Sequence, residues 1–460
     1  MARINSIRHF FDFRNLLNIL IYLLPISFIL GNYIININLL LIIFFGLLIY
    51  QNKLFEIRET KEFIILFLFF AILLTSSFIE YVFGEQKSDL VKSILFLRFF
   101  IFILVVKCHL QFQNFNYIIF LKVCFFATLI ISLDIILQYS SGSNVLGYTS
   151  GVYNSSFFKS EAIAGGYIQR FGIFGLLSIP ILFQSQKKLK ILFFTIYPIL
   201  LTVAIIFSGN RMPLIMFLFS LFPIIFFLNK RKKILISALL FLLVLSSVII
   251  KNADVLSKRF GSSFRAAINI SQMIDEIKND YDELSVYKGQ QFHHTPASLS
   301  GLGIGFKNKN YTNYPFITGH FQHYVTSSKL FLSDPIIGRG LKSFRNTCRE
   351  IWHHPNTTCG NHPHHFYLEI MNDTGILGFG LIIIFISYLI LNNFLIYRWN
   401  DQKIRFLSYA VVTLLLTEFF PFRSQGSFFS TSNATFVFFI AAVSWGLIKK
   451  DNNKKIQKKV

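Results

Sequence analysis

Long apolar runs alternate with short polar segments through most of the chain. Runs such as 39–48, 63–74 and 234–250 are as long as the buried helices of soluble proteins or longer. A helix that crosses the hydrocarbon core of a bilayer needs about 20 predominantly apolar residues. The pattern therefore predicts about twelve transmembrane helices, which we place at residues 16–31, 34–50, 62–80, 92–106, 117–138, 166–184, 190–208, 212–228, 233–251, 376–397, 404–420 and 432–448.

Two longer polar stretches, 139–165 and 252–375, separate some of these spans. We therefore expect an all-α integral membrane protein with one large loop domain between its ninth and tenth spans. Its parts are a membrane domain of about nine spans, the large loop, three C-terminal spans and a basic tail, at residues 1–251, 252–375, 376–448 and 449–460.

The large loop has two segments with helical spacing. Residues 254–285 contain few helix breakers, and Val325–Leu332 forms a second, shorter segment. We expect Pro335 to end the second helix, because proline cannot continue the backbone hydrogen bonds of a helix.

Basic residues set the orientation of the spans. Lys and Arg together number 44 against 22 Asp and Glu, a formal net charge of +22. They lie in short clusters in alternate loops rather than in one stripe, which excludes a nucleic-acid surface and matches the excess of basic residues in cytoplasmic loops. Both termini are therefore expected in the cytoplasm, and 139–165 and 252–375 on the outer side of the membrane.

Several charged residues interrupt the apolar spans. Arg98, Asp134, Arg170 and Glu418 fall in the outer halves of their spans, and Arg211 at the outer end of another. Charges inside a membrane are costly, so these residues predict one outward-facing polar cavity. The alternatives are side chains that extend to the nearer interface, or structural ion pairs. For Arg170 and Arg211 we favour a site, because guanidinium groups suit phosphate or diphosphate oxygens.

The large loop is also rich in histidine and contains two cysteines. It holds nine of the eleven histidines, His293, His294, His320, His323, His353, His354, His362, His364 and His365. In an oxidising outer compartment, Cys348 and Cys359 could form a disulfide that stabilises the loop by about 2–3 kcal/mol. The alternative is two free thiols.

Three stretches together resemble the O-antigen ligase and polymerase family. In the first, His364-His365 precedes Gly375-x-x-Gly378 by nine residues. The second is Ser208-Gly209-Asn210-Arg211, and the third is 158–167 with Arg170. Further similar features are Pro335–Gly340 with Phe344, and Gly426-Ser427-Phe428-Phe429. The resemblance covers most of the chain from about Gly142 onward.

This resemblance implies a glycosyltransferase that moves a glycan from undecaprenyl diphosphate to an acceptor hydroxyl at the periplasmic face. His364 matches the catalytic histidine of the family, and Arg211 its Arg-x-x-x-Leu arginine. His365 stands where the family usually has Asn, Ser or Gln, and Ile215 where it has Leu. The side chains expected to contact diphosphate or glycan are Arg170, Glu161, Arg339, Arg345 and His365.

The expected partners are the lipid-linked donor, membrane lipid and an acceptor. A polymerase would use another glycan as acceptor, and a ligase would use lipid A-core; the sequence slightly favours the polymerase. A chain-length regulator is a further candidate partner. A transporter that flips lipid-linked sugars is the alternative from another class, since about twelve spans around a charged cavity would suit it.

The residue types alone predict the same chemistry, independently of the family resemblance. A histidine near neutral pH can take the proton that an attacking hydroxyl loses, and arginines can stabilise the leaving diphosphate. Neither a metal nor a cofactor is then needed. Two metal alternatives stay open: a cation held by Asp280 and Asp282, with Glu283 beside them, or a zinc site built from His353, His354, His362 and His364.

Overall fold

The structure, a computed structural model, describes residues 13–54, 60–84, 89–112, 115–159, 161–227, 232–253, 256–257, 260, 319–351, 360–395 and 402–457. These residues form α-helices joined by loops, with two 3₁₀ turns and an isolated bridge between Ser143 and Thr149, and no β-strand is found in these ranges. The all-helical fold is therefore confirmed. The predicted helix at 254–285 falls almost wholly outside the described residues.

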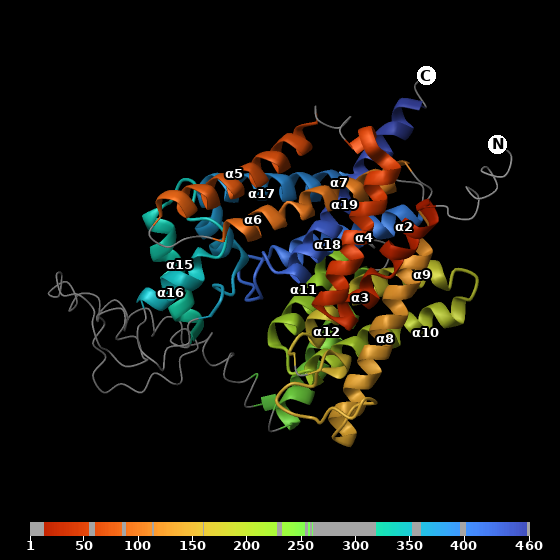
Figure 1. The fold of residues 1–460 in the computed structure, drawn as a ribbon. Helices are drawn as coiled ribbons and strands as arrows, with labels where there is room; N and C mark the ends of the chain where they lie inside the picture. The colour runs from red at the N-terminus through yellow and green to blue at the C-terminus, as the bar shows by residue number, and fades with distance from the viewer. Residues whose placement is uncertain are drawn as a thin grey trace, which may run out of the picture.

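The helices follow the apolar pattern closely (Figure 1). The N-terminal half contains α2 (Phe13–Tyr22), α3 (Leu24–Leu30), α4 (Asn32–Tyr50), α5 (Lys61–Phe83), α6 (Leu90–Phe96), α7 (Arg98–Phe112), α8 (Tyr117–Ser141), α9 (Ala164–Leu182), α10 (Lys187–Phe207), α11 (Arg211–Phe227) and α12 (Lys232–Asn252). The C-terminal half contains α15 (Gly319–Ser333), α16 (Ser343–Ile351), α17 (Phe366–Leu395), α18 (Gln402–Glu418) and α19 (Thr431–Gln457).

Seven of the described helices are long and apolar enough to cross a membrane. They are α4, α5, α8, α9, α10, α17 and α19, and the pair α2 and α3, bent by 53°, would make an eighth. Every expected span coincides with a helix or a pair of adjacent helices, but α11 and α12 are shorter apolar helices. A multi-pass membrane protein is supported, while the count of twelve spans stays a prediction.

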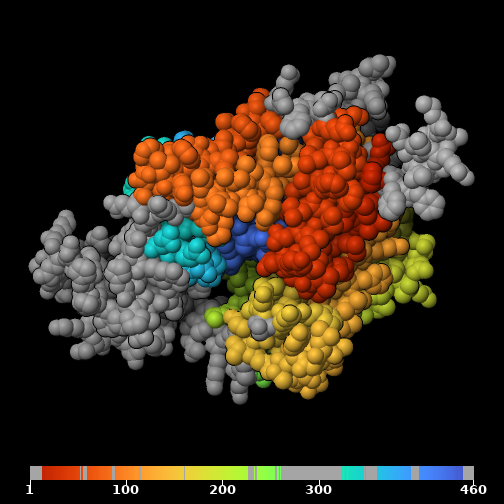
Figure 2. All heavy atoms as spheres, in the orientation of Figure 1, coloured from red at the N-terminus to blue at the C-terminus, as the bar shows by residue number. Residues whose placement is uncertain are grey.

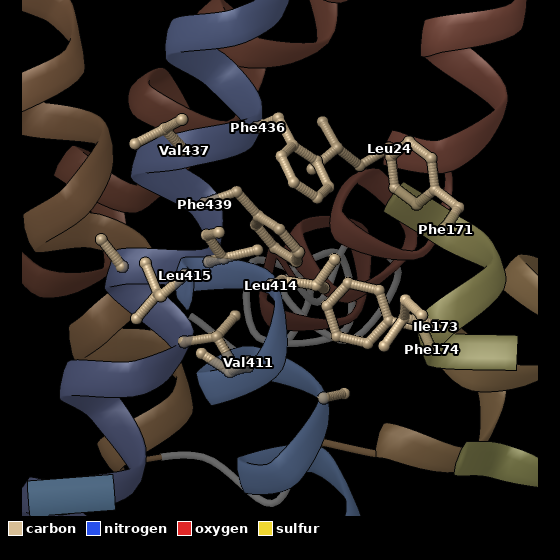
Figure 3. Close-up of a cluster of buried hydrophobic side chains, with 14 of the residues drawn as sticks. Leu24, Phe171, Ile173, Phe174, Val411, Leu414, Leu415, Phe436, Val437 and Phe439 are labelled. Atoms are coloured by element: carbon tan, nitrogen blue, oxygen red, sulfur yellow. The ribbon is translucent and has the colours of Figure 1, made fainter. Parts of the chain in front are cut away.

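Aromatic side chains fill the centre of the bundle. Phe171 of α9 packs against Phe436 of α19, and Leu414 of α18 lies between Phe174 and Phe439 (Figure 3). Figure 1 shows α15 and α16 at one end of the bundle, away from the start of α2 and the end of α19. α15 ends at Ser333, just before Pro335, as predicted.

A kink at Gly375 divides α17. Gly375 has φ +63° and ψ −169°, so the regular helical hydrogen bonds stop there. The N–H groups of Ile376 and Leu377 instead donate to the carbonyls of Pro335 and Ile336, at 2.8 and 3.3 Å. A broken helix is tolerated at membrane depth only where protein satisfies the freed backbone groups, and the loop around Pro335 does so here.

We predict that Gly375→Ala destabilises the protein while Gly380→Ala does not. A Cβ at Gly375 would lie 2.2 Å from the Ile336 carbonyl oxygen, and an L-residue at this positive φ costs roughly 1–2 kcal/mol before any clash. Gly380 lies in the same helix, and a Cβ there meets nothing within 4 Å. Thermal unfolding of the two purified variants in detergent tests this, and equal midpoints would contradict it.

Candidate active site

A cavity of about 700 Å³ lies where the ends of several helices meet the large loop. Its lining comes from α3 and α4, the 153–163 loop, the starts of α9, α11 and α19, and the loops that hold His364 and Gln425. On the face drawn in Figure 2, the molecule is hollowed between the N-terminal helices, the 142–163 loop and α15–α16, with C-terminal residues at the bottom. The cavity is therefore built from segments far apart in the sequence.

Four of the predicted site residues line this cavity: His364, Arg211, Arg170 and Glu161. Three others, Arg339, Arg345 and His365, are not part of the lining. The Arg339 guanidinium instead pairs with Glu80 at 3.3 Å and Asp334 at 3.2 Å, which fixes the loop against α5. The structure thus brings together the residues of the three motifs, but not every basic side chain that the sequence offered.

Three helices begin at the cavity wall. The first residues of α9, α11 and α19 are among its lining or directly next to it. Asn210 joins two of these helix starts, because its Oδ1 accepts the N–H of Gly165 at 3.0 Å and its Nδ2 donates to the carbonyl of Ala162 at 3.0 Å. A helix N-terminus carries partial positive charge and favours anions. Three of them around one cavity make it suitable for a negatively charged group.

A buried carboxylate holds two arginines at the cavity. Glu418 accepts from Arg170 Nε at 3.1 Å and Nη2 at 2.7 Å, and from Arg423 Nη1 at 2.8 Å. Arg170 Nη2 also donates to Asn433 Oδ1, and Arg423 Nη2 to Gln169 Oε1. Burial lowers the pKa of Arg423 to about 10, so this guanidinium still carries its charge at neutral pH. The group of three charged residues keeps one net positive charge.

His364 is held in an unusual backbone conformation. Its φ is +56°, which costs a residue other than glycine roughly 1–3 kcal/mol. The N–H of Gln425 donates to its carbonyl at 3.0 Å, which fixes the loop. Its ring centroid lies 4.2 Å from that of His362 and 5.5 Å from that of His323, which stacks at 25°. Neighbouring rings thus confine the imidazole of His364 at the cavity wall.

His365 has a structural environment instead. Its Nε2 donates to the Pro421 carbonyl at 2.7 Å, and its Nδ1 accepts the N–H of Leu368 at 3.5 Å, at the start of α17. Burial lowers the pKa of His365, although the bond to Pro421 opposes this shift. The neutral imidazole therefore uses both ring nitrogens to cap the helix and hold the 419–430 loop.

Sequence reasoning missed two basic residues of the cavity, Lys342 and Arg423. Lys342, at φ +70°, directs its Nζ to Ser427 Oγ at 3.4 Å, and Ser427 donates to the buried Glu369 at 2.6 Å. Lys342 follows the Gly338-Arg339-Gly340 motif, and Arg423 precedes the Gly426 motif. Their position beside a motif could have identified both residues. The sequence alone, however, did not show which of the basic residues near each motif faces the cavity.

The other intramembrane charges have structural partners outside the cavity lining. Arg98 Nη2 donates to Thr431 Oγ1 at 3.3 Å, and its guanidinium lies over the Phe99 ring. Asp134 accepts from Ser156 Oγ at 2.6 Å and the N–H of Val145 at 3.0 Å, which ties the 142–163 loop to α8. Of the five charged residues predicted to share one cavity, Arg170 and Arg211 line it. Glu418 is not in the lining but pairs with Arg170.

The proposed disulfide and metal sites are only partly described. Cys348 is buried and disulfide-bonded, while Cys108 and Cys124 are free. Cys359 lies outside the described residues, so its pairing with Cys348 stays a prediction. His353, His354, Asp280, Asp282 and Glu283 also lie outside them. Within the described ranges, no group of three or more His, Cys, Asp or Glu side chains is placed to hold a metal ion.

We predict that Glu418→Gln strongly destabilises the protein. Removing one partner of a buried ion pair leaves uncompensated charge and costs about 3–5 kcal/mol, and here two guanidinium groups lose their carboxylate. Asp89→Asn is the control, because Asp89 pairs with Lys92 at the surface, where a pair is worth less than about 1 kcal/mol. Thermal unfolding in detergent should show a far larger shift for Glu418→Gln; similar shifts would argue against this reading of the network.

Comparison with known proteins agrees with the motifs. A family model described as O-Antigen ligase matches residues 196–383, which include Arg211, Lys342, His364 and the kink of α17. No curated protein matches the chain. The match supports the resemblance on which the site was predicted: residues 196–383 are similar to the O-antigen ligase family.

Proposed function

We propose that the chain transfers a glycan from a polyprenyl diphosphate to an acceptor hydroxyl, at the outer face of a bacterial inner membrane. The observation that carries the proposal is the cavity, where His364 lies with four basic side chains and three helix N-termini. Such a site combines a group that can take a proton with positive charge for a leaving diphosphate. The O-antigen ligase and polymerase family catalyses this class of reaction.

Excess positive charge defines the donor end of the cavity. Arg170, Arg211, Lys342 and Arg423 line it against one acidic residue, Glu161. Glu418 and Asn433 accept hydrogen bonds from Arg170 Nε and Nη2. We therefore expect Arg170 to contribute positive charge to the cavity rather than a bidentate contact with the diphosphate. Arg211 stands at the first position of α11, where its guanidinium and the helix dipole act on the same anion. We therefore assign the closest diphosphate contact to Arg211.

The proposed step breaks the bond between the anomeric carbon and a diphosphate oxygen. The acceptor oxygen forms the new bond to that carbon, its proton passes to His364, and the diphosphate leaves with the electron pair. General-base assistance of this kind contributes typically ~10²–10⁴-fold in rate. His364 is favoured over His365 as the base, because His364 lines the cavity and His365 does not.

We predict that His364→Ala and Arg211→Ala abolish product formation, whereas His365→Ala retains substantial activity. The first two remove the base and the diphosphate contact, while the third weakens a cap at the start of α17. Glycan extension or transfer by each purified variant in nanodiscs measures this, with folded yield as the control. Retained activity of both His364→Ala and Arg211→Ala would refute the assignment. Loss in His365→Ala alone would move the base to the neighbouring residue.

The acceptor separates the two activities within the family, and we favour the polymerase. A null strain should then show core bearing a single repeat unit and no ladder on a gel of surface glycan. Bare core, with long polymer still on the lipid carrier, would instead identify a ligase. Lipid-linked intermediates extracted in parallel test the transporter, since accumulation on the inner leaflet would support flipping and contradict glycosyl transfer.

A further inference from the structure

Residues 142–153, which we call the apolar hairpin, expose hydrophobic side chains although they belong to a loop. Val145, Leu146 and Val152 are 69, 57 and 67% exposed. The hairpin is nevertheless well formed: the Asn144 side chain accepts the N–H groups of Leu146 and Tyr148 at 3.0 and 2.8 Å. Three exposed apolar side chains in an ordered hairpin are candidates for contact with a partner or a membrane.

The hairpin is fastened along α8 rather than projecting beyond it. Asp134, which is buried, accepts the N–H of Val145 at 3.0 Å and the Asn144 Nδ2 at 3.3 Å. Gln138, one turn further along α8, donates to the carbonyls of Tyr148 and Thr149, both at 3.2 Å. The chain therefore turns back after Ser141 and follows the outer turns of the helix.

This attachment sets the depth of the hairpin tip. α8 has 25 residues, so at about 1.5 Å per residue it is about 37 Å long, more than the ~30 Å hydrocarbon core. Asp134 precedes the end of the helix at Ser141 by about 10 Å. The tip at Val145 is bonded at the level of Asp134. If α8 begins at the inner boundary of the hydrocarbon core, this level is near the outer boundary, where acyl chains meet headgroups. The neighbouring α8 face is apolar and exposed at Ile130, Leu133 and Leu137.

We propose that the apolar hairpin inserts Val145, Leu146 and Val152 into the outer leaflet of the membrane that the protein spans. The lipid surface is favoured as its partner because the exposed apolar face of α8 lies only about a quarter turn from Asp134 and Gln138, which hold the hairpin. Lys159, exposed in the same loop, adds a cation suited to headgroup phosphates. Inserted side chains of this kind hold a segment in the interface plane.

The hairpin also borders the cavity. Tyr153, at its end, and Ile163, further along the loop, are both partly exposed and both line the cavity. The loop therefore connects the leaflet to the site, so that a lipid-linked donor can present its headgroup to Arg211 while its chain stays among lipids. This access role rests on the proposed function, whereas insertion of the hairpin does not.

Depth measurements on the full-length protein in phosphatidylethanolamine/phosphatidylglycerol nanodiscs test the insertion. Bimane attached at Leu146→Cys or Val152→Cys should be quenched several-fold more strongly by doxyl-labelled lipid than bimane at the matched control Thr149→Cys, and less strongly by iodide. Equal iodide quenching at all three positions would overturn the proposal. Probes shielded from both quenchers would also overturn it, because a protein partner would then cover the hairpin.

The access role is tested by the double variant V145S/L146S, with a long-chain donor and a short-chain, water-soluble donor. We expect KM for the long-chain donor to rise several-fold while kcat and the short-chain KM stay unchanged. An unchanged KM for the long-chain donor would overturn the access role. This result is distinguishable from failure of the proposed function, since loss of the His364 base removes kcat with both donors and leaves bimane quenching at the hairpin unaltered.

Discussion

The arrangement of the site depends on the ion pairs that the buried carboxylate of Glu418 makes with two arginines. It ends α18, binds Arg170 of α9 and binds Arg423 of the loop that leads into α19. Burying one of these charges alone would be prohibitive, and burying the three together is feasible only because every group has hydrogen-bond partners. Gln169, Asn433 and the Thr417 carbonyl supply the remaining partners. Three chain segments are thereby fixed at one point beside the cavity.

The requirement that buried polar groups have hydrogen-bond partners also explains the irregular backbone around the site. Inside a membrane protein, interrupted helices persist only where other protein groups replace the missing hydrogen bonds. Pro335 and Ile336 do so for the kink at Gly375, and Asn210 does so for the start of α9. The glycines of the motifs therefore allow close approach of backbones. The polar chemistry of the motifs is supplied by the residues between and beside these glycines.

The sequence predicted the helices well because apolar runs of membrane length have few alternative structures. It also predicted that His364, Arg211, Arg170 and Glu161 would lie together, because motif order and topology placed them on the same side. It did not show that Lys342, rather than Arg339, faces the cavity. The direction in which each of these neighbouring basic side chains points depends on where the backbone of the loop turns. The positive φ at Gly338, Gly340 and Lys342 decides this, and no local pattern in the sequence specified it.

The different environments of His364 and His365 follow from the start of α17. A helix leaves its first N–H groups without partners, and the residue before the helix is the natural acceptor. His365 occupies that position and is drawn into capping through Nδ1, while the positive φ of His364 turns the preceding side chain toward the cavity. The strain at His364 is retained because Gln425 and the neighbouring histidine rings hold it. A strained backbone beside a cap is thus a physical reason for adjacent, chemically identical residues to lie in different environments.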